Sequence, residues 1–143
     1  MTGGSPEPDD APASATISSD EVILKRLPTR PHTVKERPGV GLTATSYALG
    51  PRPSERFPSY SRQRFTSPAQ LLELASAAGQ DVSGWSVAAI RVANVRQLGL
   101  DVVSRPTDED PGHCEIVPTE QQLFTDAIWS RLAKQAPVVF TQR

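Results

Sequence analysis

The chain has one cysteine, Cys114, among its 143 residues. No disulfide can form within the chain, and a small secreted scaffold held together by disulfides is excluded. The sequence also lacks any run of about 18 apolar residues, which excludes a membrane-spanning helix. The first twenty residues carry neither a basic start nor an apolar stretch, so they do not predict a signal peptide. We therefore expect a cytoplasmic protein with no membrane partner.

Several catalytic and nucleotide-binding motifs are also missing. There is no G-x-G-x-x-G, no G-x-x-x-x-G-K-[ST] and no G-x-S-x-G, the signatures of dinucleotide binding, nucleoside triphosphate binding and serine hydrolysis. The two histidines, His32 and His113, are too few for a zinc site made of histidines alone. Asp108, Glu109 and Asp110 lack the spacing of a calcium loop, so a solvated turn is favoured there. We expect no cofactor and no metal.

The charges are distributed unevenly along the chain. The formal net charge of -1 divides into -5 up to Leu24, +7 from Lys25 to Arg64 and -3 from Phe65 onward. Residues 1–20 have almost no large apolar side chain, which predicts a disordered acidic tail. Residues 21–143 are long enough for one small domain, with a Pro/Arg-rich irregular part at 21–66 and a regular core at 67–143.

Proline and glycine interrupt the front half of the chain. Ten of the 14 prolines lie at or before Pro68. The apolar cluster at 22–27, closed by Pro28 and Pro31, predicts a short edge strand or an entry segment. From residue 29 to residue 67 we expect loops and short extended pieces, in which 43–49 is the best candidate for a strand.

The back half has clearer patterns. A helix should begin at Pro68, with a cap from Thr66 or Ser67, and end at Gly79. The apolar pattern then predicts an interior strand at 85–90, a short helix at 92–98, two strands at 100–104 and 113–117 that form a hairpin, and a last strand at 138–140. A long helix should run from 118–119 to Pro137, with Thr119 and Gln122 as a capping box.

These elements predict an α+β fold. We expect a small, mostly antiparallel sheet of three to five strands, packed by two main helices and preceded by a Pro-rich irregular front half.

The segment Pro111–Ile116 is the most chemically suggestive part of the chain. If residues 113–117 are extended, His113 and Glu115 share one face and Cys114 points to the other, toward the interior. An imidazole beside a carboxylate can act as acid and base, and Arg105 in the preceding loop would complete the catalytic site of a small hydrolase or transferase. The H-x-E spacing matches zinc deaminases in part, but their P-C-x-x-C is absent. The competing interpretation is a structural histidine that holds the loop by hydrogen bonds.

The basic stretch from Lys25 to Arg64 contains several aromatic residues. Cations for phosphates and rings for bases are the components of a surface that binds single-stranded nucleic acid. The candidate contacts to nucleic acid or to a protein partner are Arg52, Arg56, Arg62, Arg64 and Tyr60. In the alternative interpretation the rings belong to the core and the arginines form a solubilising rim, which the sequence pI of 6.1 favours.

Residues 85–117 resemble a group of short bacterial proteins. The shared pattern is an apolar strand, an R-x-L-G turn, a valine-rich strand and a Pro-rich loop that ends in P-[AG]-H-[AC]-x-[IV]. The matching residues are Arg96, Leu98, Gly99, Pro106, Pro111, Gly112, His113 and Cys114, and Pro51-Arg52-Pro53-Ser54 matches an upstream R-P-S element. The resemblance implies a bacterial source and no particular mechanism.

The missing catalytic set makes a non-enzymatic protein the leading hypothesis. We expect an accessory or protein-interaction component of a bacterial multi-protein system, in which the tail and the Pro/Arg-rich middle contact a protein partner. A hydrolase or transferase at His113 and a nucleic-acid-binding protein are the two alternatives. The sequence indicates no oligomeric state.

Overall fold

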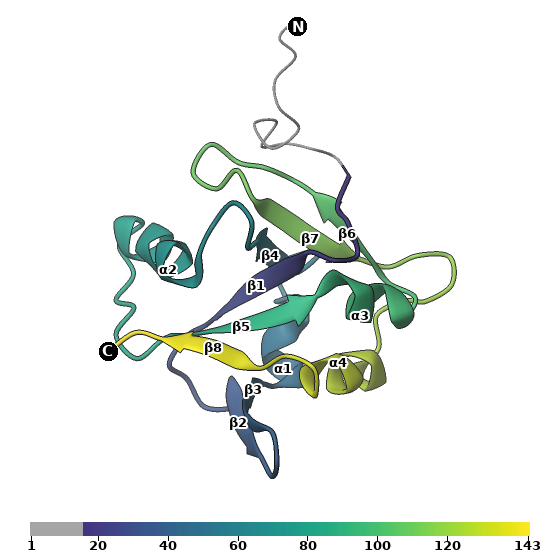
Figure 1. The fold of residues 1–143 in the computed structure, drawn as a ribbon, viewed down its shortest axis with the longest axis horizontal. Helices are drawn as coiled ribbons and strands as arrows, with labels where there is room; N and C mark the ends of the chain where they lie inside the picture. The colour runs from purple at the N-terminus through teal and green to yellow at the C-terminus, as the bar shows by residue number, and fades with distance from the viewer. Residues whose placement is uncertain (1–15) are drawn as a thin grey trace, which may run out of the picture.

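The computed structural model describes residues 16–143, and its centre is a six-stranded antiparallel sheet in the order β6-β7-β4-β1-β5-β8 (Figure 1). The strands of this sheet are β1 (Val22–Leu27), β4 (Ser59–Arg62), β5 (Ser86–Arg91), β6 (Asp101–Ser104), β7 (His113–Val117) and β8 (Val138–Thr141). A separate hairpin consists of β2 (Val34–Arg37) and β3 (Gly41–Ala44). The helices are α1 (Ser46–Leu49), α2 (Pro68–Ala77), α3 (Val92–Gln97) and α4 (Asp126–Ala133).

The prediction of three to five strands packed by two main helices is wrong. The described residues form eight strands and four short helices, so the fold is mostly β. The expected irregular front half is wrong as well, because residues 22–62 supply four of the strands. Proline marks the ends of these strands: Pro28 directly follows β1, Pro38 lies in the turn between β2 and β3, and Pro58 directly precedes β4. A proline at a strand end costs no ladder hydrogen bond, so proline density did not exclude a sheet.

Strand β1 lies in the middle of the sheet and not at its edge. It pairs antiparallel with β4 on one side and with β5 on the other. Ile23, Leu24 and Leu27 are at most 1% exposed, because helices cover both faces of the sheet. A run that is apolar on both faces is typical of an interior strand, and this signal outweighs the flanking prolines.

Two apolar clusters form the core, one on each face of the sheet. On one face, α2 packs through Leu71 and Leu72 against Leu24 and Val87. The larger cluster on the other face includes side chains from β1, α1, α3 and α4, among them Ile23, Leu27, Leu49, Val95, Ile128, Trp129 and Leu132.

The elements with complete local signals match their predictions. Helix α2 has the predicted cap, because the Ser67 hydroxyl accepts from the Gln70 N–H at 3.2 Å and the Gln70 side chain accepts from the Ser67 N–H at 2.9 Å. Gly79 follows this helix with a φ of +95°, which favours glycine. Strand β5, helix α3, the β6–β7 hairpin and strand β8 also lie where they were predicted.

The long helix predicted from residue 118 is wrong. Helix α4 begins at Asp126, where the Thr125 hydroxyl caps it by accepting from the Ile128 N–H at 3.2 Å. Thr119 does not cap a helix, because its hydroxyl donates to the carbonyl of Gly99. The predicted strand at 43–49 is also wrong in part, since β3 ends at Ala44 and α1 follows directly.

Residues 16–21 lie against the core and are held by two arginines. Arg62 is completely buried, and its Nε and Nη2 donate to the two carboxylate oxygens of Glu21 at 2.7 and 2.6 Å. Arg96 donates from Nη2 to the carbonyl of Ile17 at 2.7 Å, and the Ile17 side chain is 3% exposed. Burial raises the pKa of Glu21, but the hydrogen bond and charge of Arg62 outweigh it, so the net shift is downward.

Most of the predicted acidic tail, residues 1–15, lies outside the described residues. Within residues 16–143, no helix is long and apolar enough to cross a membrane.

The buried pair predicts a large loss of stability when one partner is removed. In Arg62→Met, the Glu21 carboxylate stays largely buried and loses both hydrogen bonds from Arg62 and its nearest counter-charge, so we expect the free energy of unfolding to fall by about 3–5 kcal/mol. Urea denaturation followed by circular dichroism measures this change. Arg64→Met is the matched control, because Arg64 is partly exposed and 3.9 Å from the same carboxylate, and should cost less than about 1 kcal/mol. Equal effects of the two substitutions would contradict the structural role of Arg62.

Candidate functional site

The three predicted catalytic residues lie together at the loop end of the β6–β7 hairpin. Side chains of β7 alternate as predicted, with Cys114 buried and with His113 and Glu115 half-buried on the opposite face. The Nδ1 of His113 is 2.7 Å from the carbonyl oxygen of Arg105, and the Nε of Arg105 is 3.5 Å from a carboxylate oxygen of Glu115. Because a carbonyl only accepts, Nδ1 carries the proton in this bond and Nε2 is the basic nitrogen of the neutral ring.

A polar groove of about 310 Å³ lies beside His113, between the sheet and α2, and Asp110 is one of the residues that line it. The Asp110 carboxylate accepts from the Ser61 hydroxyl, from the Thr66 hydroxyl at 2.8 Å and from the Gly112 N–H at 3.0 Å. These bonds attach the loop before β7 to β4 and the turn that follows it. The Ser61 hydroxyl is thereby bound to a carboxylate and not to the histidine.

Packing accounts for two further residues of the Pro111–Ile116 segment. A Cβ on Gly112 would lie 3.1 Å from both the Arg62 carbonyl oxygen and the Cβ of Phe65, so the close approach of the loop to β4 favours glycine. Burial raises the pKa of the Cys114 thiol well above its usual range, so Cys114 is not a thiolate nucleophile.

The predicted contact residues Arg62 and Tyr60 are not on the surface. Arg62 is buried against Glu21, and Tyr60 is 2% exposed with its hydroxyl donating to the Leu49 carbonyl at 2.8 Å. Both side chains are therefore part of the core.

The other predicted contacts, Arg52, Arg56 and Arg64, are exposed. Two of them lie over neighbouring rings, Arg56 at 5.0 Å from the centre of Phe57 and Arg64 at 5.3 Å from the centre of Phe65. The side chain of Arg52 contributes to a cleft.

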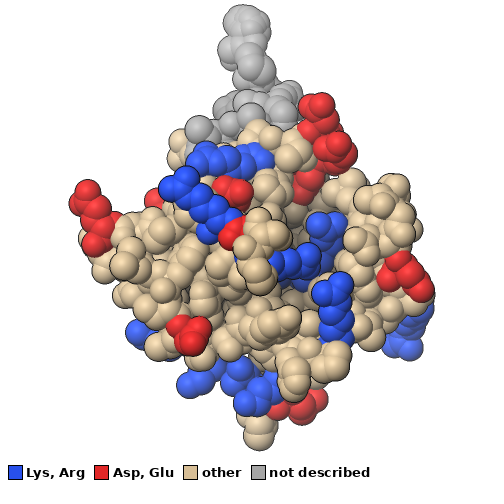
Figure 2. All heavy atoms as spheres, turned by 180° about the vertical axis from the view of Figure 1, so that it is seen from behind, with Lys and Arg blue, Asp and Glu red and all other residues tan. Residues whose placement is uncertain are grey.

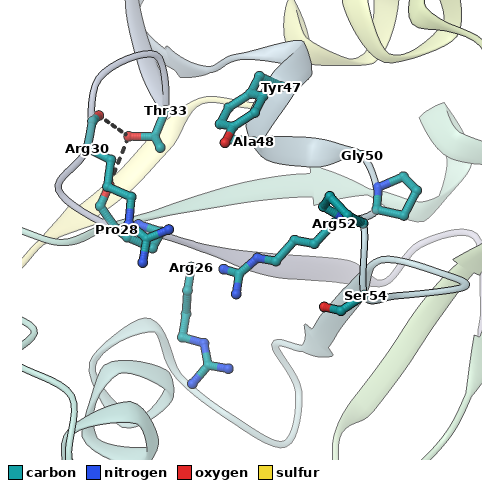
Figure 3. A pocket seen from close by; sticks show the side chains of 11 residues that line it. Arg26, Pro28, Arg30, Thr33, Tyr47, Ala48, Gly50, Arg52 and Ser54 are labelled. Carbon is teal, nitrogen blue, oxygen red and sulfur yellow. Dashed lines mark hydrogen bonds between the residues drawn. The ribbon is translucent and has the colours of Figure 1, made fainter.

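This cleft, which we call the arginine cleft, was not predicted. It has a volume of about 360 Å³ and lies at the carboxyl end of β1, between the loop that follows β1, helix α1 and residues 50–54. Its lining residues are Arg26, Pro28, Arg30, Thr33, Tyr47, Ala48, Gly50, Pro51, Arg52, Pro53 and Ser54. Figure 3 shows Arg30 and Arg52 reaching toward the middle of the cleft from opposite sides, with Arg26 pointing away beside them.

The turns that carry two of these arginines are fixed by side-chain hydrogen bonds. The Thr33 hydroxyl donates to the carbonyls of Pro28 at 2.9 Å and of Arg30 at 3.1 Å. On the other side, the Arg52 N–H donates to a carboxylate oxygen of Glu55 at 2.9 Å. The backbone of both walls is therefore held in place before any ligand arrives.

The arginine cleft has an excess of positive charge. None of its lining residues is acidic, and among the described residues no carboxylate lies within 4.0 Å of the guanidinium nitrogens of Arg26, Arg30 or Arg52. Burial, followed by the positive charge of Arg52, lowers the pKa of Arg26, and Asp110 opposes the shift. Figure 2 shows several basic side chains around a hollow near the middle of one face, with most of the acidic side chains toward its periphery.

Arg52 was predicted as a contact residue. Arg26, Arg30 and Tyr47 belong to the basic stretch with aromatic residues for which nucleic-acid binding was an alternative, but they were not singled out as contacts. The signal that could have found them is the +7 charge of residues 25–64. Charge alone does not separate these arginines from Arg62, which lies in the same stretch and is buried.

Among residues 16–143, no group of three or more His, Cys, Asp or Glu side chains could hold a metal ion.

Lys25 is a buried cation near the arginine cleft. Its Nζ donates to the Ser59 carbonyl at 2.9 Å and lies 4.8 Å from the centre of the Tyr60 ring. Burial lowers the pKa of Lys25 to about 8; Glu55 opposes the shift, and Arg52 and Arg26 add to it.

The lowered pKa of Lys25 predicts a pH-dependent stability. Between a pH of about 8 and the usual lysine value of 10.5, the folded state binds fewer protons at Lys25 than the unfolded state does, so the free energy of unfolding should rise with pH. The rise should total about 3 kcal/mol. Urea denaturation at several pH values should show it in the wild type and not in Lys25→Met, whereas Lys35→Met, which removes an exposed lysine, should keep it. The same slope in Lys25→Met would contradict this assignment.

No family model, curated protein or solved structure matches this chain. The resemblance of residues 85–117 to short bacterial proteins stays a prediction. Any function assigned to this protein therefore depends on the chemistry of the arginine cleft and of the residues around His113.

Proposed function

We propose that this protein is a non-enzymatic accessory component that binds an anionic partner in the arginine cleft. The observation that carries the proposal is that Arg26, Arg30 and Arg52 line one cleft and that, among the described residues, none of the three forms an ion pair with a carboxylate. A bacterial, cytoplasmic multi-protein system is the setting we propose, because the chain lacks a recognisable catalytic set and has a single cysteine.

The physical basis is the cost of gathering like charges. The guanidinium groups of Arg30 and Arg52 approach each other across the cleft and repel, and burial together with the positive charge of Arg52 disfavours the charged form of Arg26. An anion in the cleft would replace this repulsion with charge-assisted hydrogen bonds, for which arginine offers a planar, bidentate geometry. A cluster that costs stability in the free protein is typical of a binding site.

The proposal predicts anion-dependent stability. Phosphate and a polyglutamate peptide should raise the melting temperature of the wild type, with a gain of about 2.7 kcal/mol at a hundredfold excess over the dissociation constant. The triple variant that combines Arg26→Gln, Arg30→Gln and Arg52→Gln should lose this response. In the absence of anion, its melting temperature should equal or exceed that of the wild type. Differential scanning calorimetry measures both quantities.

A matched control removes three exposed cations outside the cleft. The control variant combines Arg91→Gln, Arg131→Gln and Lys134→Gln. It loses as many positive charges as the cleft variant and should keep the anion response. If both triple variants respond alike, the cleft is not the binding site. At native expression, affinity purification with mass spectrometry should recover a partner with the wild type and the control, and not with the cleft variant.

A second candidate function is a small hydrolase or transferase at His113. The observation that favours it is the proximity of His113, Glu115 and Arg105, of which His113 lines the polar groove, with Nε2 as the basic nitrogen of the neutral ring. Against it, the Ser61 hydroxyl in this groove donates to Asp110, and the carboxylate of Glu115 is 3.5 Å from Arg105.

Substitution distinguishes the two candidates. If His113 is structural, His113→Ala should lower the melting temperature, because the bond to the Arg105 carbonyl is lost, and Glu115→Gln should have little effect on cellular function. Loss of cellular function in both variants at an unchanged melting temperature would support catalysis. A complementation assay together with thermal denaturation measures these outcomes.

A further inference from the structure

We infer that the ligand of the arginine cleft is a nucleotide unit, with its base on the ring of Tyr47 and its phosphate between Arg30 and Arg52. The inference rests on the proposed anion-binding function and adds the chemical class of the ligand. It depends on an aromatic ring and a cation cluster that line the same cleft.

Tyr47 is the most exposed large apolar side chain among the described residues, at 74%. It lies on α1, whose start is capped by the Thr45 hydroxyl, which accepts from the Ala48 N–H at 3.2 Å. The C-terminal end of α1 packs into the core through Leu49. The exposed ring therefore stands on a fixed backbone, as a platform for stacking requires.

The position of the ring relative to the arginines suits a nucleotide. Figure 3 shows Tyr47 at the rim of the cleft and the guanidinium groups of Arg30 and Arg52 across its middle. A base on the ring would direct its phosphate toward the two arginines, which can hold phosphate oxygens bidentately. Pro28, Pro51 and Pro53 supply apolar wall for the sugar.

The volume and charge of the cleft agree with this ligand. Its volume of about 360 Å³ is within the range of small-ligand sites, and the positive charges of Arg30 and Arg52 match a phosphate. An acidic peptide would satisfy the arginines but would leave the Tyr47 ring without a partner. The ring is the feature that favours a nucleotide over a peptide.

The nucleotide could be free or part of a single strand. Arg26 lines both the arginine cleft and the polar groove beside His113, so the two depressions adjoin. A strand could therefore continue past the bound nucleotide. The shared chemistry is one base with one phosphate, and the experiment separates the two sources.

The experiment measures the binding of two labelled oligonucleotides of equal charge to the full chain by fluorescence anisotropy. A short oligothymidine and an abasic oligonucleotide of the same length carry the same phosphates, and only the first has bases. Thymidine monophosphate, as an unlabelled competitor, represents the free nucleotide, and polyglutamate represents the acidic peptide. The variants are Tyr47→Ala, Tyr47→Phe and Arg52→Gln, with Arg131→Gln as the charge control.

We expect oligothymidine to bind about tenfold more tightly than the abasic strand. Tyr47→Ala should remove this difference, Tyr47→Phe should keep it, and Arg52→Gln should weaken both ligands while Arg131→Gln does not. With two arginine–phosphate contacts, the logarithm of the association constant should fall with the logarithm of salt concentration at a slope of about -1.4. Competition by thymidine monophosphate would assign a free nucleotide, and its failure to compete would assign the strand.

Two outcomes would overturn the inference in distinguishable ways. If the abasic strand or polyglutamate binds as tightly as oligothymidine, and Tyr47→Ala changes nothing, the cleft binds anions without regard to bases and the proposed function survives alone. If none of the ligands binds at low salt, or if Arg52→Gln does not weaken the binding of any of them, both the inference and the proposed function fail.

Discussion

Strand β1 runs between β4 and β5 with both of its faces buried, and this placement determines most of what surrounds it. Its Leu24 faces α2 and its Ile23 and Leu27 face the larger cluster, so one strand joins the two halves of the core. Glu21, directly before β1, binds the buried Arg62 of β4. Arg26, near the end of β1, lines the cleft at which we propose binding.

Arginine serves two purposes in this molecule, and the partner of each guanidinium group decides which. Arg62 and Arg96 are bound by carboxylates and backbone carbonyls, and they hold residues 16–21 against the sheet. Arg30 and Arg52 have no such carboxylate among the described residues and project into open space. The first arrangement stabilises the fold, whereas the second leaves interaction energy available to a ligand.

The Pro111–Ile116 segment shows how packing can imitate a catalytic motif. Gly112 fits a close approach to β4, Cys114 fills the core, and His113 bonds to the backbone of the loop that it follows. Asp110 holds the same loop through three donors. These contacts are sufficient physical reasons for a glycine, a small apolar residue and a histidine at these positions, and a catalytic role for His113 remains a separate proposal.

Elements with local signals could be predicted from the amino-acid sequence. These predictions were confirmed for the cap and the terminal glycine of α2, the apolar run of β5, the alternating side chains of β7 and the short helix α3. Each of these signals depends only on neighbours within a few residues. The central place of β1 and the position of β4 in the sheet became apparent only in the folded chain, because they depend on pairing between residues far apart in the sequence. The candidate site divides in the same way: composition predicted a basic stretch, but whether an arginine in it lies in the core or lines a cleft depends on which distant carboxylates and rings the fold brings to it.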